Sequence, residues 1–157
     1  MADTWDVELW VYDISQGFAG MMSSSLLGFH LEAIYHTSIV IYGVEYFFGG
    51  VARAEATAPT SGVQKCTPGA TVLGQPMRKE FLGKTELDPD TFQLWLDEIG
   101  RTEYRGDTYS LFKHNCNNFS EDAAQFLGNT LHLAKIIQGQ YRDQITSSNF
   151  KGVELHI

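Results

Sequence analysis

The segment IYHTSIVIYGVEYFF, residues 34–48, carries the clearest signal of β structure in the chain. Its β-branched and aromatic residues are typical of strands. Residues 34–42 predict one strand and residues 45–48 its hairpin partner, with Gly43 and Val44 as the connection. The first run is almost continuously apolar, as in a strand that is buried on both faces. We therefore expect a buried hairpin here.

Other short runs extend this pattern along the chain. Residues 7–12, 51–57, 63–66 and 78–87 each combine β-branched or aromatic residues with flanking turn residues, so each predicts a strand. Together with the helices described next, they predict an α+β fold with a mainly antiparallel sheet.

One helix is predicted to begin at Asp88-Pro89-Asp90, with Asp88 as the N-cap, Pro89 at the first helical position and an acid in the first turn. Gly100 is expected to end it. Its apolar residues recur at helical spacing. They are Phe92, Trp95, Leu96 and Ile99.

A second helix is predicted to begin after Asn115, a good N-cap, and to stop at Gly128. Shorter helices are expected over residues 18–27 and 131–137. The apolar residues expected on the buried face of the second helix are Phe119, Ala123, Phe126 and Leu127.

Composition limits the class of protein. The 157 residues suffice for about one domain, and 43% of them are hydrophobic, which excludes a disordered chain. The net charge of −8 disfavours nucleic acid and anionic membranes as partners. We expect no membrane span and no signal peptide. The cysteines, Cys66 and Cys116, are then expected to be free thiols, in the cytoplasm or the nucleus.

The most informative site signal is Cys116, which falls at the first position of the second predicted helix. The helix dipole and the free N–H groups there favour a thiolate, the reactive form of cysteine. Those N–H groups are also suited to stabilising an oxyanion. The alternative is a small buried apolar residue at a capped helix start, which is a common place for an inert cysteine.

A nucleophilic cysteine needs a base, and the chain has five histidines. His36 is the first choice, because the predicted strand would hold it rigidly. The alternative for His36 is a structural histidine at the margin of the sheet. The other histidines, which are weaker candidates, are His30, His114, His132 and His156.

The chain carries the motifs YHTSIV at residues 35–40 and YSLFKHNCNNFS at residues 109–120. Both motifs resemble the PPPDE superfamily of permuted papain-fold peptidases, and in particular its desumoylating isopeptidase (DeSI) group. The resemblance covers roughly residues 7–140. It implies a circularly permuted papain-like fold, with His36 and Cys116 as a catalytic dyad and no assigned third residue. It also implies cleavage of the isopeptide bond between a ubiquitin-like modifier, SUMO above all, and a lysine, and a homodimer with the site between subunits.

Substrate-binding candidates follow from the shape of the modifier's thin, glycine-rich tail, which needs a narrow channel. The expected wall residues are Trp10, Tyr12, Tyr35 and Phe48, each with ordinary core packing as the alternative. Asn115 and Asn117 are candidates for capping or for oxyanion stabilisation. We expect no metal, because the spacing of cysteines and histidines matches no ligand set. No cofactor is expected either.

Two other functions fit the same residues. A thioesterase acting on S-acylated proteins would use the same dyad, and a non-catalytic binding module would keep only the fold. The catalytic domain is expected over residues 1–145. Residues 146–157 are expected to form a C-terminal tail, as in a domain from a longer protein.

Overall fold

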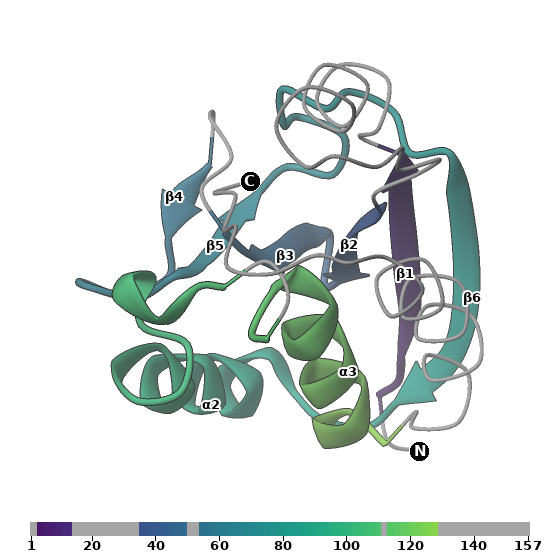
Figure 1. Cartoon of the computed structure of the whole chain (residues 1–157). Coiled ribbons are helices and arrows are strands. Elements are labelled where there is room, and N and C mark those ends of the chain that lie inside the picture. The colour runs from purple at the N-terminus through teal and green to yellow at the C-terminus, as the bar shows by residue number, and fades with distance from the viewer. Residues whose placement is uncertain (1–2, 14–34, 50–53, 111–112, 129–157) are drawn as a thin grey trace.

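The computed structural model describes residues 3–13, 35–49, 54–110 and 113–128. These residues form a six-stranded sheet with the order β4-β5-β3-β2-β1-β6, and every neighbouring pair is antiparallel. Figure 1 shows the sheet with helices α2 and α3 beside it. The strands are β1 (Trp5–Asp13), β2 (Tyr35–Ile41), β3 (Val44–Phe48), β4 (Glu55–Ala56), β5 (Val63–Cys66) and β6 (Arg78–Thr85). The helices are α2 (Pro89–Arg101), the 3₁₀ turn η2 (Gly106–Thr108) and α3 (Cys116–Phe126). The predicted α+β class with a mainly antiparallel sheet is confirmed.

The β2–β3 hairpin forms as expected, and β2 is buried along nearly its whole length. Its turn is Tyr42-Gly43, one residue earlier than predicted. Both residues have positive φ, 56° and 71°. A two-residue turn with this geometry matches the right-handed twist of the paired strands, and glycine adopts it without strain.

Two other predicted strands are shorter in the structure. Only Glu55–Ala56 forms a strand among the described residues of 51–57, and β6 ends at Thr85 rather than at residue 87. The predicted helices at residues 18–27 and 131–137 lie outside the described residues. The expected domain end at residue 145 and the tail 146–157 lie outside them too.

Helix α2 begins as predicted, with Asp88 accepting a hydrogen bond from the Thr91 amide. It ends at Arg101, one residue beyond Gly100. Gly100 is buried against Ser61, where an added Cβ would lie 2.4 Å from the Ser61 hydroxyl oxygen. Gly100 therefore allows the loop that contains Ser61 to approach the helix closely, and it does not end the helix.

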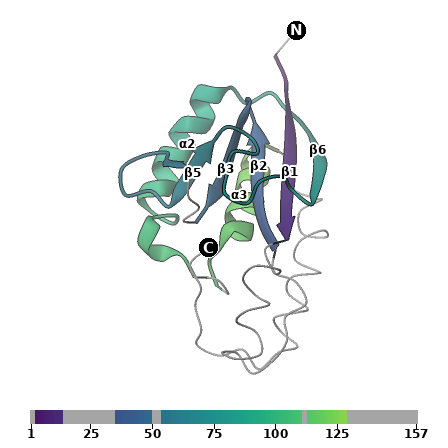
Figure 2. The same ribbon diagram turned by 90° about the horizontal axis from the view of Figure 1, so that it is seen from above.

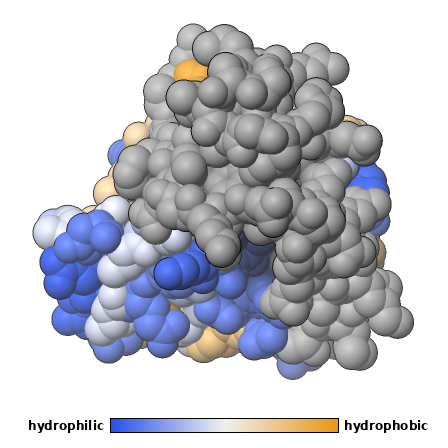
Figure 3. Space-filling model, in the orientation of Figure 1, coloured by the Kyte–Doolittle hydropathy of each residue, from blue (hydrophilic) through white to orange (hydrophobic). Residues whose placement is uncertain are grey.

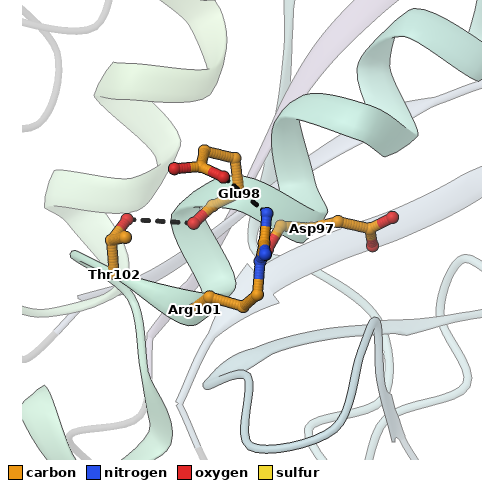
Figure 4. Close-up of polar contacts among 4 residues, drawn as sticks. All are labelled: Asp97, Glu98, Arg101 and Thr102. Atoms are coloured by element: carbon orange, nitrogen blue, oxygen red, sulfur yellow. Dashed lines mark hydrogen bonds and ion pairs between the residues drawn. The ribbon is translucent and has the colours of Figure 1, made fainter.

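Side-chain hydrogen bonds instead join the residues in the last turn of α2 (Figure 4). The Arg101 guanidinium donates to the Glu98 carboxylate at 2.5 Å, and the Thr102 hydroxyl donates to the Glu98 carbonyl at 2.9 Å. These groups lie at the surface. In the view of Figure 3, which has the orientation of Figure 1, the described surface around α2 is mostly hydrophilic.

Alternation along the strands divides the sheet into two faces. One face packs against α2 and α3 and carries the main apolar core, which includes Leu9, Ile39 and Phe48 from the sheet. We call this the helix face. Figure 2 shows the sheet and the two helices from above. The core residues from the helices are Phe92, Leu96, Ile99, Phe119, Ala123, Ala124 and Leu127.

Two aromatic residues expected on the buried faces of the helices are less buried than predicted. Phe126 is 37% exposed, and Trp95 is only partly buried at the edge of the core. Their rings stack on each other, with centroids 4.6 Å apart. They therefore form the outer rim of the contact between α2 and α3. Among the described residues, no helix is long and apolar enough to span a membrane.

The second face of the sheet, here called the opposite face, carries an unusual set of side chains. The strand register places Tyr12 across from His36, and Val40 across from Glu45. On this face the sheet therefore carries polar groups where a purely structural sheet would carry apolar ones. The residues concerned are Trp10, Tyr12, His36, Ser38, Glu45 and Phe47.

Candidate active site

Cys116 is the first residue of α3, as predicted, and it is 4% exposed. Asn115 caps the helix by accepting hydrogen bonds from the amides of Asn117 and Asn118. The Asn118 side chain in turn accepts from the Asn115 amide at 2.8 Å, which completes a capping box. This local motif explains why the helix begins at the cysteine.

The protonation of Cys116 differs from the expectation. Burial raises the pKa of the thiol to about 11, and this outweighs the opposing hydrogen bonds from the backbones of Thr37, Asn117 and Cys116 itself. The helix start alone does not yield a thiolate.

His36 lies near the start of β2 and is 1% exposed. Its ring contacts those of Tyr12 and Phe47, with centroid distances of 5.7 and 5.4 Å. Burial lowers the pKa of the imidazole to about 4, so the ring is neutral at pH 7. Within the described part of the chain, neither ring nitrogen has a hydrogen-bond partner. The packing of two aromatic rings, rather than hydrogen bonding, therefore orients His36.

The two motifs meet through the neighbours of the two candidate catalytic residues. The Thr37 hydroxyl donates to Asn117 Oδ1 at 2.7 Å and lies 2.9 Å from the Ser120 hydroxyl. All three side chains are buried. Asn117 Oδ1 also lies 3.9 Å from Cys116 Sγ. This polar contact fixes the start of α3 against the start of β2.

The predicted wall residues separate onto the two faces. Trp10 and Tyr12 are buried on the opposite face with His36. The Lys79 ammonium lies 4.4 Å from the centre of the Trp10 ring, a cation–π contact. Tyr12 donates a hydrogen bond to Glu45. The structure thus brings only two of the four wall candidates to the face that carries the candidate base.

The other two wall candidates lie on the helix face. Tyr35 is partly buried against the core, and Phe48 is completely buried. Phe48 packs on Tyr104, at 4.9 Å between ring centroids, and it also lines a pocket of roughly 190 Å³ together with Gly49 and Gly62. A role in substrate binding remains a prediction for all four residues.

The two asparagine candidates have different surroundings. Asn115 is the helix cap described above. Asn117 is buried, and its Nδ2 group has no hydrogen-bond partner among the described residues. An unused donor beside a candidate nucleophile is the feature expected of an oxyanion-stabilising group.

Of the weaker base candidates, only His114 lies in the described residues. Its Nδ1 atom is 3.1 Å from the Thr108 carbonyl, and its ring stacks on Tyr104 at 4.5 Å. These contacts are those of a structural histidine. The described residues contain no group of three or more His, Cys, Asp or Glu side chains that could hold a metal ion.

Sequence reasoning missed three residues near the site: Thr37, Ser120 and Glu45. Thr37 and Ser120 lie within the two motifs, but neither has a signal that predicts their contact. Glu45 lies in a predicted strand, and a charged residue within an apolar run is the signal that could have drawn attention to it. The structure shows it to be fully buried.

The chain belongs to the family described as the PPPDE putative peptidase domain, whose model matches residues 5–147. With the sheet and helices described above, this membership confirms the predicted permuted papain-like α+β fold.

The curated relatives include three proteins named desumoylating isopeptidase 1. The rat protein is 45% identical over 121 residues, the human protein 43% and the Xenopus laevis protein 41%. Each match covers 77% of this chain and 66% of the relative, so the chain spans just under two thirds of the length of these relatives.

Proposed function

We propose that the protein is a cysteine isopeptidase that removes a ubiquitin-like modifier, SUMO above all, from substrate lysines. One structural observation carries this proposal. Cys116, at the start of a capped helix, is followed by Asn117, whose Oδ1 atom accepts a 2.7 Å hydrogen bond from the hydroxyl of Thr37, the residue after His36. Membership of a peptidase family and the names of the curated relatives support the same chemistry.

The resting dyad in this proposal is uncharged, with a protonated thiol and a neutral imidazole. A ring nitrogen of His36 removes the thiol proton as Cys116 Sγ attacks the carbonyl carbon of the isopeptide bond. The imidazolium then protonates the lysine amine as the C–N bond breaks. Water attacks the resulting thioester with His36 as the base, which releases the modifier's carboxylate and restores the thiol.

The oxyanion formed by this attack needs donors that are already in place. The candidates closest to the sulfur in sequence are the backbone N–H of Cys116 and the Nδ2 group of Asn117, which has no hydrogen-bond partner in the part of the chain that the structure describes. Both belong to the first turn of α3, where the helix dipole also favours a negative charge. Asn117 would then hold the Thr37 hydroxyl with its oxygen and the oxyanion with its nitrogen.

The test uses SUMO joined through its C-terminal glycine to the side chain of a lysine in a fluorescent peptide. Wild type is expected to release the peptide, and Cys116→Ala to be inactive. His36→Ala should lose at least about a hundredfold in rate, the usual contribution of a general base. Lys65→Ala, a surface change on β5, is the matched control and should keep full activity.

The result separates the alternatives. Release of a fatty acid from an S-acylated peptide, without cleavage of the SUMO probe, would replace this proposal with the thioesterase. Cleavage of neither substrate, with Cys116 unreactive toward alkylation, would leave a binding module.

For the quaternary state we propose a homodimer, which light scattering coupled to size-exclusion chromatography would detect. We also propose action in the cytoplasm or nucleus, which imaging of a tagged chain would test.

A further inference from the structure

The opposite face of the sheet holds a buried carboxylate to which the dyad assigns no role. Glu45 is completely buried in β3. Its Oε2 atom accepts hydrogen bonds from the Tyr12 hydroxyl at 2.5 Å and the Ser38 hydroxyl at 2.6 Å, and its Oε1 atom accepts from the Gly69 amide at 2.9 Å. No lysine or arginine pairs with it among the described residues.

Burying a carboxylate without a neighbouring cation costs free energy. The three hydrogen-bond donors that converge on Glu45 therefore indicate a specific role for it. Two of the donors are neighbours of His36. Tyr12 lies directly across from His36 in the β1–β2 register, and Ser38 is two residues further along the same face of β2. The carboxylate therefore fixes the side chains that surround the candidate base.

The link to His36 runs through the Tyr12 ring. That ring contacts the imidazole at 5.7 Å between centroids, and its hydroxyl is anchored by Glu45. Phe47 contacts the imidazole as well, at 5.4 Å. Because the ring nitrogens have no hydrogen-bond partner in the described part of the chain, these two rings are what hold the imidazole in place.

We propose that Glu45 and Tyr12 are a positioning pair for His36: the carboxylate anchors the phenol, and the phenol ring sets the orientation of the imidazole. The pair would take the place of the hydrogen-bonded third residue that orients the base in a catalytic triad. This inference rests on the proposed dyad, though not on the identity of the modifier.

The test measures the rate of alkylation of Cys116 by iodoacetamide, resolved from Cys66 by peptide mass spectrometry. Tyr12→Phe keeps the ring and removes only the anchored hydroxyl. It should slow Cys116 about threefold to tenfold in the wild-type background and by less than about twofold in a His36→Ala background, because residues that act together give non-additive effects. Tyr46→Phe, on β3 but facing the helices, is the matched control and should change neither rate.

Glu45 supplies a second measurement. Glu45→Ala removes the anchor and should slow Cys116 as Tyr12→Phe does. Glu45→Gln keeps an acceptor for the phenol and should restore the rate to within about twofold of wild type, since the hydrogen bond rather than the charge is what positions the ring.

Each outcome has one meaning. Equal effects of Tyr12→Phe in both backgrounds, or no effect in either, would overturn the positioning pair alone. A His36→Ala variant that alkylates Cys116 as fast as wild type would overturn the dyad as well. If the SUMO probe is not cleaved but the non-additive pattern appears, the pair stands and only the proposed substrate fails. A loss of stability cannot imitate the pattern, because it would act in both backgrounds.

Discussion

The Thr37 hydroxyl donates a 2.7 Å hydrogen bond to Asn117 Oδ1, and this contact joins two residues that are 80 positions apart in the sequence. Thr37 follows the candidate base and Asn117 follows the candidate nucleophile. The bond is buried, so it is not weakened by competition with water. It therefore holds the strand and the helix that carry the two candidate catalytic residues against each other.

Thr37→Val should test this relationship, since valine keeps the shape of threonine and removes its hydroxyl. The hydrogen bonds to Asn117 and Ser120 are lost, and the free energy of unfolding should fall by about 1–3 kcal/mol. Urea denaturation measures this change. Thr102→Val, at the exposed end of α2, is the control and should change stability by no more than about 0.5 kcal/mol. Equal losses in the two variants would contradict a special role for Thr37.

The pKa of Cys116 predicts how its reactivity depends on pH. Because burial raises the pKa of the thiol to about 11, the thiolate fraction should keep growing from pH 7 to pH 10. In His36→Ala, which lacks the base, alkylation of Cys116 should then accelerate by about tenfold per pH unit across this range, in proportion to the thiolate. The wild type should be faster at pH 7 and depend less on pH, because neutral His36 removes the thiol proton during the attack. A His36→Ala rate that levels off below pH 8 would contradict the raised pKa of the thiol.

His36 predicts a loss of stability in acid. Its pKa falls from 6.5 to about 4 on burial, so the unfolded chain binds the proton more readily than the folded chain does. The contribution of neutral His36 is fully present above pH 6.5 and is lost as the pH falls toward 4. A shift of this size corresponds to about 3 kcal/mol.

His36→Gln provides the comparison, because glutamine does not titrate there. Between pH 7 and pH 4.5 the wild type should lose about 2–3 kcal/mol more of its unfolding free energy than the variant. Urea denaturation at both pH values measures the difference. The carboxylates titrate in both proteins and cancel. Parallel losses would show that burial does not lower the pKa of His36 in the folded protein.

Glu45 also acts on the second cysteine. The pKa of Cys66 is raised to about 11, first by burial and second by the nearby Glu45 carboxylate. Glu45→Gln removes that negative charge, so the pKa should fall and Cys66 should alkylate faster at pH 8. Glu55→Gln, on the neighbouring strand β4, is the control and should leave the Cys66 rate unchanged. An unchanged rate in Glu45→Gln would show that the carboxylate does not influence the thiol.

Gly100→Ala should be destabilising, although alanine is the better helix former. The added Cβ would lie 2.4 Å from the Ser61 hydroxyl oxygen and 2.8 Å from its Cβ. Overpacking of this kind costs about 1–3 kcal/mol, which thermal or urea unfolding can measure. Combining the change with Ser61→Gly removes the clash and should recover most of the loss. A stabilised Gly100→Ala variant would show that the loop containing Ser61 moves away from the added methyl group at little cost in free energy.

Much of this protein could be read from local signals. The hairpin at residues 34–48, the Asp88 cap and the start of α3 at Cys116 all follow from interactions within a few residues, which a sequence displays directly. The two motifs also resemble a peptidase family, and this resemblance predicts catalytic roles for His36 and Cys116 from the sequence alone.

Tertiary packing alone decided the rest. The Thr37–Asn117 bond, the burial of Glu45 and the separation of Tyr12 from Phe48 onto different faces depend on strands and helices that are distant in sequence. The protonation states of the proposed dyad also depend on tertiary packing. A helix start predicts a lower thiol pKa, but complete burial raises it, because removing a charged group from water costs more than the first turn of the helix restores.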